Sequence, residues 1–573
     1  MTTQLTVAKA IAESLKRHGV EYIFAQSLPS AVILACEEVG IRQIAYRQEN
    51  MGGAMADGYA RVSGKVSVVA AQNGPAATLL VAPLAEAIKA SVPVVALVQE
   101  VERNQADRNA FQEIDHAAVF ASCSKWTRKL TTADRVYDYV DAAFIAAASG
   151  RPGPAVLLLP ADVLREAVPA SVVPREASLG HWPLDRVRPA QDLIETVAAK
   201  IAAAGHPVIM AGGGAVAPRA SAAIAKLQEF AHLPVFTTNM GKGVVAETHP
   251  LSCGVLGALV GPTALGKQTL PIYRDADLII QIGTRNNQNG TDSWRNVSPT
   301  AELVQIDLDA QELGRNYEAT RLVGDAASTV EALIEALSRC DLRQRKERRS
   351  AVEQRIALAW SDFETARAPL LSDNTPLRPE RVMVTLQSLI GPDDVVVADA
   401  SYSSMWVVGQ LRSGQAGSRF ITPRGLAGLG WGLPLAIGAK LAKPQGRVIA
   451  LVGDGGFAHS WAELETLTRM TVPLLVIVLN NGILGFQRDA ETVKFGSYTT
   501  ACHFHDVDHA AIARACGCQG WRVSGADELD SALSAWAAEP SAALLEVITD
   551  PEAHPPLSLF AGTLDHELKE AHA

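Results

Sequence analysis

The stretch between residues 453 and 481 constrains the fold more than any other part of the sequence. An apolar run (448–452) leads into a glycine-rich turn that contains Asp454. A helical segment (461–470) and a second apolar run (472–479) follow, and this run leads to Asn480 and Asn481. The order of strand, tight turn, helix and strand predicts a βαβ unit with parallel strands. Asp454 and Asn481 should then meet at the carboxyl edge of one sheet, where such sheets bind ligands.

The residue types at this edge favour a metal-bound diphosphate. The carboxylate of Asp454 and the amide oxygen of Asn481 are hard ligands that suit Mg²⁺, and diphosphate oxygens can complete its octahedron. The glycines beside Asp454 let backbone N–H groups approach phosphate oxygens. If the Gly-Asp-Gly turn is taken alone, an ordinary βαβ unit is the alternative.

Taken together, the turn, the helix, the strand and the asparagine pair resemble the diphosphate-binding motif of thiamine diphosphate (ThDP) enzymes. The resemblance covers nearly the whole chain and is closest to the acetolactate synthase branch (acetohydroxyacid synthase large subunit). It implies that Asp454, Asn481 and the backbone carbonyl of Ile483 bind Mg²⁺. It also implies that Leu429 wedges the cofactor into a bent form, while the carbonyl of Gly428 accepts a hydrogen bond from its amine. The cofactor-binding residues implied for this part of the chain are Ser401, Tyr402, Ser403, Gly428, Leu429, Gly453, Asp454, Gly455, Gly456, Asn481, Ile483, Leu484 and Gly485.

Two departures from the family lie close to this motif. Relatives carry glutamine and histidine where this chain has Tyr402 and Ser403, so the contacts must differ in detail. The hydroxyls that follow the strand at 395–398 are still expected to reach diphosphate oxygens, with an N-cap cluster for the next helix as the alternative. Ala490 stands where acetolactate synthases place the tryptophan that shapes the acceptor pocket. We therefore expect a wider pocket and a substrate bulkier than pyruvate.

Length and composition predict three α/β domains, each a doubly wound parallel sheet. The 573 residues exceed what one core can organise and suit domains of roughly 150–200 residues. We expect an N-terminal pyrimidine-binding domain (1–185), a central Rossmann-like domain (186–340), a helical linker (341–370) and a C-terminal diphosphate-binding domain (371–573). A net charge of −10 argues against nucleic-acid binding. The seven scattered cysteines, with no signal peptide or membrane span expected, favour reduced thiols in a cytoplasmic protein.

Glu49 is the principal catalytic candidate in the N-terminal domain. A glutamate that starts a helix is commonly only a partner for the helix dipole. The surrounding segment (47–61), however, resembles the ThDP family along its length. There a glutamate hydrogen-bonds the aminopyrimidine ring and drives formation of its imino tautomer. We expect the helix itself over residues 54–61. Gln48 replaces the family's histidine. Residues 25–30 replace the family's glycine-rich loop, which lines the substrate side of the cofactor in relatives, so the resemblance leaves the substrate open.

Further site residues of this domain follow from the same resemblance. Phe111 and Gln112 match a segment that faces the cofactor from the neighbouring subunit in acetolactate synthases, and Lys125 matches a lysine in their substrate channel. Core packing for Phe111 and a solvated surface position for Lys125 are the alternatives. Asn73, in the turn after the strand at 66–71, is expected to bind the cofactor. Candidates for acid–base work are His459, His503, His505 and His509.

Glycine follows the predicted strands of the central domain, as a nucleotide pocket at a sheet edge requires. The turns resemble the FAD-binding domain of acetolactate synthases, although residues 286–289 (Asn-Asn-Gln-Asn) replace the family's Phe-Asp-Asp-Arg. FAD, another adenine nucleotide, CoA or an empty pocket all remain open. The residues expected to line this pocket are Gly212, Gly213, Gly214, Met240, Gly241, Gly283, Arg285, Asp307 and Asp325.

The resemblance implies decarboxylation of a 2-oxoacid coupled to carbon–carbon bond formation. The alternative reactions are those of benzaldehyde lyase, 2-hydroxyacyl-CoA lyase and oxalyl-CoA decarboxylase, with hydroxyketone or acyl-thioester substrates. A non-catalytic nucleotide-binding homologue is a further alternative, against which the intact Glu49, Asp454 and Asn481 argue. A dehydrogenase with two Rossmann domains does not fit this sequence, because the Gly-x-Gly-x-x-Gly turn that such an enzyme requires is missing. By resemblance the active site lies between subunits, so we expect a homodimer or homotetramer.

Overall fold

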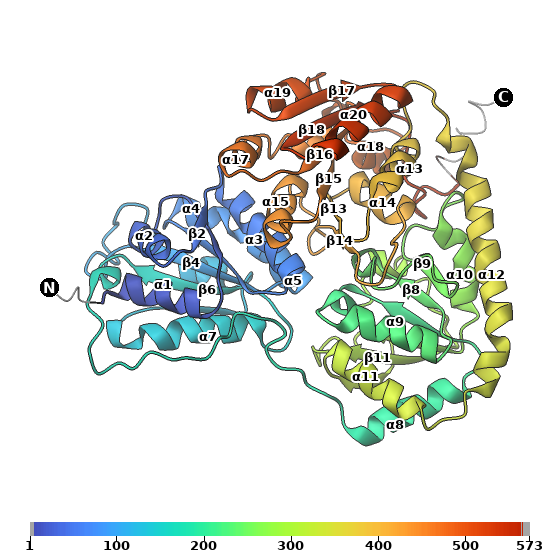
Figure 1. The fold of residues 1–573 in the computed structure, drawn as a ribbon, viewed down its shortest axis with the longest axis horizontal. Coiled ribbons are helices and arrows are strands. Elements are labelled where there is room, and N and C mark those ends of the chain that lie inside the picture. The colour runs from blue at the N-terminus through green and yellow to red at the C-terminus, as the bar shows by residue number, and fades with distance from the viewer. Residues whose placement is uncertain (1–4, 563, 565–573) are drawn as a thin grey trace.

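Three sheets of six parallel strands follow one another along the chain, each flanked by helices (Figure 1). The computed structural model describes residues 5–562 and 564. The predicted fold class, α/β with three consecutive doubly wound parallel sheets, is confirmed. Strands covered by helices on both faces are apolar along their whole length, which is why they appear in the sequence as continuous apolar runs. The domain boundaries at residues 185, 340 and 370 stay predictions.

The N-terminal sheet has the strand order β2-β1-β3-β4-β6-β5. Its strands are β1 (Tyr22–Phe24), β2 (Arg42–Ile44), β3 (Ser67–Ala71), β4 (Val94–Glu100), β5 (Trp126–Lys129) and β6 (Ala155–Pro160). Its helices are α1 (Val7–Arg17), α2 (Ser30–Glu38), α3 (Glu49–Ser63), α4 (Pro75–Leu79), α5 (Val81–Ala90), α6 (His116–Phe120) and α7 (Val136–Ala148).

The central sheet has the order β12-β11-β10-β7-β8-β9, which is the strand order of dinucleotide-binding Rossmann domains. Its strands are β7 (Pro207–Ala211), β8 (Val235–Thr237), β9 (Ser252–Val255), β10 (Leu278–Ile282), β11 (Glu302–Asp307) and β12 (Thr320–Val323). Its helices are α8 (Gln191–Ala203), α9 (Ala220–Phe230), α10 (Leu265–Arg274) and α11 (Ala326–Leu337). The expected linker is the long helix α12 (Arg343–Arg367), which runs along the edge of the molecule in Figure 1 and buries Ile356, Ala359 and Phe363.

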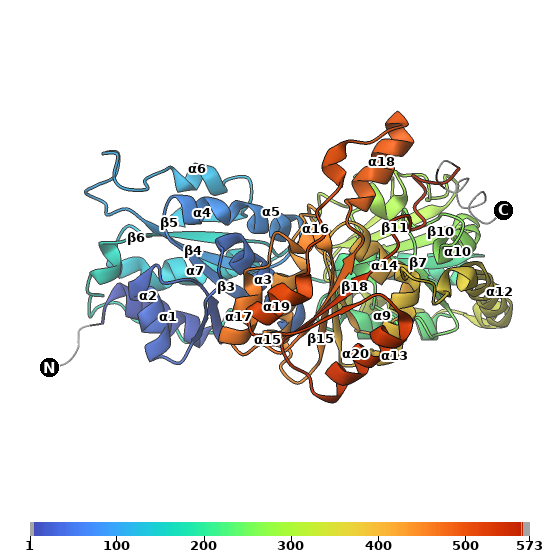
Figure 2. The same ribbon diagram turned by 90° about the horizontal axis from the view of Figure 1, so that it is seen from above.

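The C-terminal sheet, β14-β13-β15-β16-β18-β17, repeats the relative strand order of the N-terminal one. Its strands are β13 (Val395–Ala398), β14 (Arg419–Ile421), β15 (Val448–Gly453), β16 (Leu475–Asn480), β17 (Gln519–Val523) and β18 (Ala543–Ile548). Its helices are α13 (Pro379–Leu389), α14 (Tyr402–Gln410), α15 (Gly432–Ala442), α16 (Asp454–Phe457), α17 (Glu463–Arg469), α18 (Gly485–Phe495), α19 (His509–Ala515) and α20 (Ala526–Ala538). In Figure 2, α18 projects from the body of this domain.

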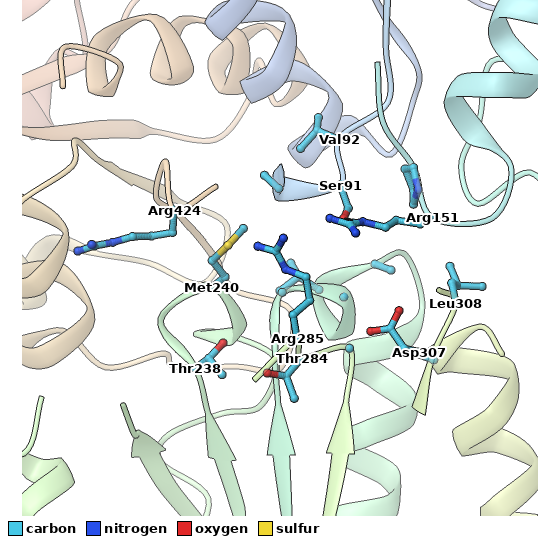
Figure 3. A pocket seen from close by; sticks show the side chains of 18 of the residues that line it. Ser91, Val92, Arg151, Thr238, Met240, Thr284, Arg285, Asp307, Leu308 and Arg424 are labelled. Atoms are coloured by element: carbon cyan, nitrogen blue, oxygen red, sulfur yellow. Dashed lines mark hydrogen bonds between the residues drawn. The ribbon is translucent and has the colours of Figure 1, made fainter. Parts of the chain in front are cut away.

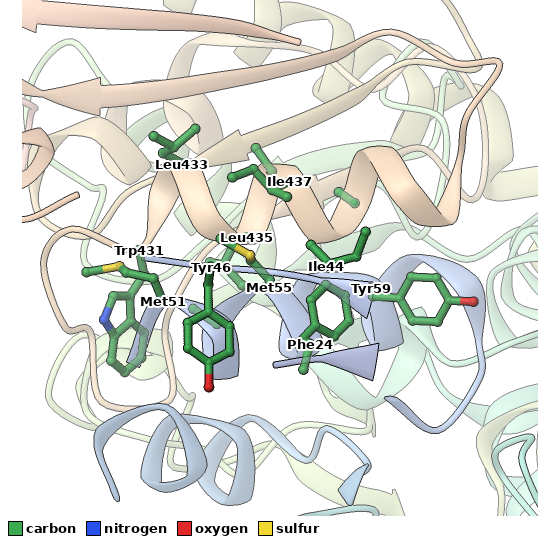
Figure 4. Close-up of a cluster of buried hydrophobic side chains, with 14 of the residues drawn as sticks. Phe24, Ile44, Tyr46, Met51, Met55, Tyr59, Trp431, Leu433, Leu435 and Ile437 are labelled. Carbon is green, nitrogen blue, oxygen red and sulfur yellow. The ribbon is translucent and has the colours of Figure 1, made fainter. Parts of the chain in front are cut away.

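The N- and C-terminal domains pack together through α3 and α15. One continuous cluster of buried apolar side chains spans both domains. In Figure 4, Trp431 and Leu435 of the C-terminal domain lie against Met51 and Met55 of α3, whereas Leu433 points to the opposite side, toward the C-terminal strands. This contact fixes how α3, and with it Glu49, sits relative to the C-terminal sheet.

Two predicted helices have different bounds in the structure. Helix α3 begins at Glu49 and includes Gly52 and Gly53, although the sequence predicted a start near residue 54. Glycine is needed there for packing, because a Cβ on Gly52 would lie 2.1 Å from the Tyr46 ring. The segment that follows Asp454 forms the short helix α16, a turn, and then α17, so the helix expected over 461–470 covers a shorter range.

Candidate active site

The carboxyl ends of β13, β15 and β16 surround a cavity of about 60 Å³. Strands β13 and β15 are neighbours on which the chain connections turn to opposite sides, and sheets of this kind bind ligands at such a point. Nearly all the residues predicted for the diphosphate end of a cofactor meet in this cavity. They are Ser401, Tyr402, Ser403, Leu429, Gly453, Asp454, Gly455, Gly456, Asn481, Ile483, Leu484 and Gly485.

Asp454 and Asn481 lie side by side, as predicted, because β15 and β16 are adjacent parallel strands with Gly453 opposite Leu479. Asp454 is buried, and burial raises the pKa of its carboxyl to about 6. Its Oδ2 accepts a hydrogen bond from the backbone N–H of Gly482 at 3.0 Å, and Asn481 Oδ1 accepts from Ile483 N–H at 3.3 Å. A buried carboxylate next to amide and carbonyl oxygens fits a hard divalent cation, since the cation would offset the cost of burying the charge.

The cavity does not hold a metal by carboxylates alone. No group of three or more His, Cys, Asp or Glu side chains placed to bind a metal occurs within the described residues. A cation at Asp454 would therefore take its other ligands from Asn481, from backbone oxygen and from a bound phosphate group. Mg²⁺ is commonly bound by such a set of ligands, in which one or two carboxylates act together with phosphate oxygens.

A buried pair supports the loop that carries Asn481. Asn480 donates from Nδ2 to Glu546 Oε1 at 2.7 Å, and its Oδ1 accepts from Gly482 N–H at 3.1 Å. Glu546, on β18, is fully buried. The sequence did not single out this carboxylate, because its partner is 66 residues away on a neighbouring strand.

The hydroxyl of Tyr402 has a hydrogen-bond partner within the protein. It donates to Asp489 Oδ2 at 2.5 Å, and burial raises its pKa well above the ordinary value. The Tyr402 ring instead packs against Gly485, where a Cβ would come within 2.9 Å of it. The Tyr402 hydroxyl is thus engaged by Asp489, and its ring forms part of the cavity wall; that the hydroxyls after β13 reach diphosphate oxygens stays a prediction.

Glu49 lies at the start of α3, preceded by Gln48 as N-cap. It does not line the cavity around Asp454 of its own chain. The C-terminal domain nevertheless reaches this segment, because Glu463 accepts hydrogen bonds from the backbone N–H groups of Arg47 at 3.0 Å and Gln48 at 3.2 Å. The position of Glu49 is thus tied to α17 within one chain.

Phe111 and Gln112 form a braced arm beside the turn after β3. Asn73 Nδ2 donates to the carbonyl oxygens of both residues at 3.1 Å, and Gln112 has a positive φ of 61°. His116 accepts from Gly74 N–H at 2.8 Å and pairs with Glu100 at 2.8 Å. The Phe111 side chain is 82% exposed, so core packing does not explain it.

Lys125 lies away from this arm. It precedes β5, at the amino edge of the sheet, whereas Phe111 and Gln112 lie beside the turn after β3, at the carboxyl edge. Its amine donates to the Ser149 carbonyl at 2.9 Å, and partial burial, with a smaller contribution from Arg151, lowers its pKa to about 8. One chain therefore does not bring Lys125 together with Phe111 and Gln112.

None of the four candidate histidines lines the cavity around Asp454. His459, His503 and His505 are exposed. His509 is buried against the rings of Phe457 and Trp461, and burial lowers its pKa. The geometry therefore gives these side chains no shared site.

A second cavity, of about 190 Å³, lies where the three domains meet (Figure 3). Most of the residues predicted for a nucleotide line it, namely Gly213, Gly214, Met240, Gly283, Arg285, Asp307 and Asp325. Gly212 and Gly241 lie behind the wall, where a Cβ on either would meet backbone oxygen at 2.4 and 2.1 Å respectively. Asp325 also caps α11 and pairs with Arg186 at 2.9 Å.

The charge of this second cavity favours an anionic ligand. Its cationic side chains come from all three domains and are Arg61, Lys89, Arg151, Arg285, Arg419 and Arg424. Burial lowers the pKa of Arg285 more than the nearby carboxylates of Glu312 and Asp307 raise it. The carboxyl of Asp307, at the end of β11, is partly buried, and desolvation raises its pKa to about 6. Phosphate groups would offset the desolvation of such arginines.

Family models match all three parts of the chain. The N-terminal TPP binding domain of thiamine pyrophosphate enzymes matches residues 5–119, the central domain residues 194–333 and the C-terminal TPP binding domain residues 399–547. The chain belongs to the thiamine pyrophosphate (ThDP) enzyme family. The family resemblance drawn from the Asp454–Asn481 motif is thereby confirmed.

Acetolactate synthases are among the proteins that this chain resembles. A probable acetolactate synthase large subunit of Methanocaldococcus jannaschii is 30% identical over 95% of this chain and 92% of its own length. The acetolactate synthase of Mycobacterium bovis is 31% identical over 99% and 92%, and the large subunit of Parasynechococcus marenigrum 32% over 94% and 87%. The chain is an acetolactate synthase-like ThDP enzyme. No helix within residues 5–562 is long and apolar enough to cross a membrane.

Four carboxylates that support the site of this ThDP enzyme were not identified from the sequence. Asp399, Glu86, Glu463 and Glu546 are carboxylates at 1% exposure or less that accept backbone or amide hydrogen bonds around the cofactor segments. Glu546 interrupts an apolar strand, and this was the one local signal that a partner was needed. Asp399, Glu86 and Glu463 gave no such local signal, because their hydrogen-bond partners come from other segments of the chain.

Proposed function

We propose that this ThDP enzyme decarboxylates a 2-oxoacid and joins the remaining carbon unit to an acceptor carbonyl. The convergence of Asp454, Asn481 and Leu429 on one cavity in a chain similar to acetolactate synthases supports this proposal. Glu49 is proposed to hydrogen-bond a pyrimidine ring nitrogen and to hold the proton exchanged there.

The residues proposed to bind the cofactor have two roles, one electrostatic and one steric. Asp454, Asn481 and the Ile483 carbonyl are proposed to bind Mg²⁺, with the backbone N–H groups of residues 453–456 facing the diphosphate. Leu429 is proposed to hold the bend between the two rings. ThDP, when bound, supplies an electron sink beside the substrate carbonyl. The protein residues therefore bind, orient and exclude water.

A second copy of the chain is proposed to complete the site, in a homodimer or homotetramer. Glu49 and the cavity at Asp454 do not meet within one chain. Apolar side chains are exposed on both parts, with Phe111 at 82%, Leu426 at 55% and Phe504 at 40%. A partner that covers them would bring a pyrimidine-binding domain to a diphosphate-binding domain. Dilution to monomers should then abolish turnover, and full activity from a monomer would contradict the proposal.

We propose an acceptor pocket wider than that of acetolactate synthases. Ala490, on α18, stands where acetolactate synthases are expected to carry a tryptophan. An alanine is smaller than a tryptophan by far more than one methylene, and a single methylene in a pocket changes selectivity by ~1–3 kcal/mol. A lyase or decarboxylase acting on a hydroxyketone or an acyl thioester is therefore the second candidate. The deciding experiment incubates the protein with ThDP, Mg²⁺ and a series of carbonyl donors, and follows CO₂ release and product mass. Efficient acetolactate formation, with larger donors ignored, would contradict the wide pocket.

The second cavity is proposed to hold an adenine nucleotide, with FAD as the first candidate. The Rossmann strand order, the glycine turns and the arginines of three domains support this. Absorbance of the purified protein between 300 and 500 nm (about the flavin range) and titration with FAD, ADP and CoA would identify the ligand. We propose a cytoplasmic location, because the seven cysteines are all free, as is typical of proteins in a reducing compartment.

A further inference from the structure

The loop that carries Leu429 rises between two buried carboxylates from different domains. Glu86, on α5 of the N-terminal domain, accepts from the backbone N–H of Gly425 at 2.6 Å, from that of Leu426, and from that of Ala427 at 3.3 Å. Three successive amides thus converge on one side chain that is 1% exposed. Such a row of N–H groups is an anion-binding nest, here filled by a carboxylate of the protein itself.

The far end of the loop is held by Asp399, which follows β13. Its Oδ2 accepts from Gly430 N–H at 2.9 Å and its Oδ1 from Trp431 N–H at 3.1 Å. Gly430 and Trp431 lie directly before α15, with Trp431 as its N-cap, so Asp399 also fixes where the loop enters that helix. Asp399 is 1% exposed. Each end of the loop is therefore fixed by hydrogen bonds to a buried acid.

Between these anchors the loop has little packing of its own. Leu426 is 55% exposed and Leu429 37% exposed. Ala427 and Gly430 have positive φ values of 62° and 88°, which a free chain seldom adopts together. The position of Leu429 in the cavity around Asp454 therefore depends on the two anchors more than on side-chain contacts.

Glu86, which holds the first end of the loop, is itself in contact with Arg61. Arg61 lies within 3.5 Å of Glu86 Oε1, donates to the Thr422 carbonyl at 3.1 Å, and pairs with buried Asp57 at 2.5 Å. Gly425 fits only without a side chain, because its Cβ would lie 2.6 Å from the Glu86 backbone oxygen. The Glu86 side chain is thus held by Arg61, and the space between Glu86 and Gly425 leaves no room for a side chain at residue 425.

We propose that Glu86 and Asp399 are positioning residues that clamp the loop 425–431 and so set the place of Leu429 against the cofactor. This inference rests on the proposed role of Leu429 in ThDP binding. It gives the N-terminal domain a task beyond Glu49: α5 of one chain shapes the diphosphate half of the site in the same chain. All the hydrogen bonds of the clamp are made between protein groups, so the clamp is measurable in the cofactor-free protein.

The test compares Glu86→Ala with the wild type by amide hydrogen exchange of the peptide that covers residues 424–432. Without cofactor, exchange in this peptide should rise about tenfold or more, since its N–H groups lose their acceptor. Calorimetry should find ThDP affinity close to wild type, because the residues around Asp454 are untouched. Deuterium exchange at the thiazolium C2 and kcat should fall, by as much as about a hundredfold for a 1 Å displacement, with the substrate KM little changed.

Two further variants and one control keep the outcome decisive. Gly425→Ala perturbs the same contact from the loop side and should reproduce the loss, whereas Glu86→Gln keeps one acceptor and should restore part of it. Glu247→Gln is the matched control, because Glu247 is a buried acid that pairs with Lys242 of its own domain, accepts from the Ser413 N–H of the C-terminal domain, and does not touch the loop. It should lower the melting temperature and leave exchange at 424–432 unchanged.

Two results would overturn the inference. One is wild-type exchange at 424–432 in Glu86→Ala and Gly425→Ala. The other is a loss of ThDP affinity and melting temperature in the Glu86 variants with unaltered C2 exchange, which indicates a purely structural role. If the wild type itself fails to bind ThDP, the proposed function falls, while loop exchange in the cofactor-free protein still decides whether the clamp exists.

Discussion

Helices α3 and α15 approach so closely that a single methyl group at their contact should weaken the joint between two domains. A Cβ on Gly438 of α15 would lie 1.9 Å from the Met55 carbonyl oxygen and 2.7 Å from Tyr59 N. A Cβ on Gly58 of α3 would lie 2.1 Å from the Leu435 carbonyl oxygen. Carbon and carbonyl oxygen normally stay about 3.3–3.6 Å apart. Gly438→Ala must therefore push the helices apart by more than about 1 Å, because the obstacles are backbone atoms.

The size of the effect follows from two opposing contributions. Replacing glycine by alanine inside a helix gains about 1 kcal/mol from helix propensity. Overpacking costs about 1–3 kcal/mol, and we take the upper end because no side chain can rotate away. The net expectation for Gly438→Ala is a loss of about 2 kcal/mol in the free energy of unfolding.

Gly409→Ala supplies the matched control. Gly409 is in α14 of the same domain, and its Cβ would meet nothing closer than Leu259 Cδ1 at 3.6 Å, an ordinary contact. This variant should gain about 1 kcal/mol, so the two identical substitutions should differ by about 3 kcal/mol. In thermal melts the Gly438 variant should unfold several degrees below the Gly409 variant, at about 2–4 °C per kcal/mol for domains of this size. Equal or reversed melting temperatures would refute the reasoning.

Three other predictions concern ligands. Asp454→Ala removes the anionic oxygen next to Asn481, so ThDP affinity at ordinary Mg²⁺ levels should collapse, as it should after chelation of Mg²⁺ from the wild type; unchanged binding by calorimetry would exclude the metal site. Glu49→Gln should keep ThDP but slow deuterium exchange at thiazolium C2 by orders of magnitude, and a wild-type rate would remove Glu49 from proton transfer. Arg285→Ala should weaken binding of an adenine nucleotide diphosphate by about 1.5–3 kcal/mol, the range of a charged hydrogen bond, while ThDP affinity stays unchanged; equal nucleotide affinity in both proteins would separate the second cavity from phosphate recognition.

The fold class and the diphosphate end of the site could be predicted from the order of residues along the chain. Apolar runs that end in glycine turns encode parallel strands buried on both faces, and this property is local. The meeting of Asp454 with Asn481 also followed from local order, because one βαβ unit places both at the same edge. Helix ends were predicted less accurately: α3 begins at Glu49, whereas the sequence predicted a start near residue 54.

Which distant groups face one another became apparent only in the folded chain. Glu86 contacts a loop 339 residues away, Tyr402 turns its hydroxyl to Asp489, and Lys125 lies at the sheet edge opposite Phe111. These pairings depend on how helices such as α3 and α15 dock, and the docking is set by shape at single atoms, as at Gly438. Periodicity reports that a residue is buried, and it carries no information about which partner buries it. The positions of the supporting carboxylates were for that reason beyond the reach of sequence alone.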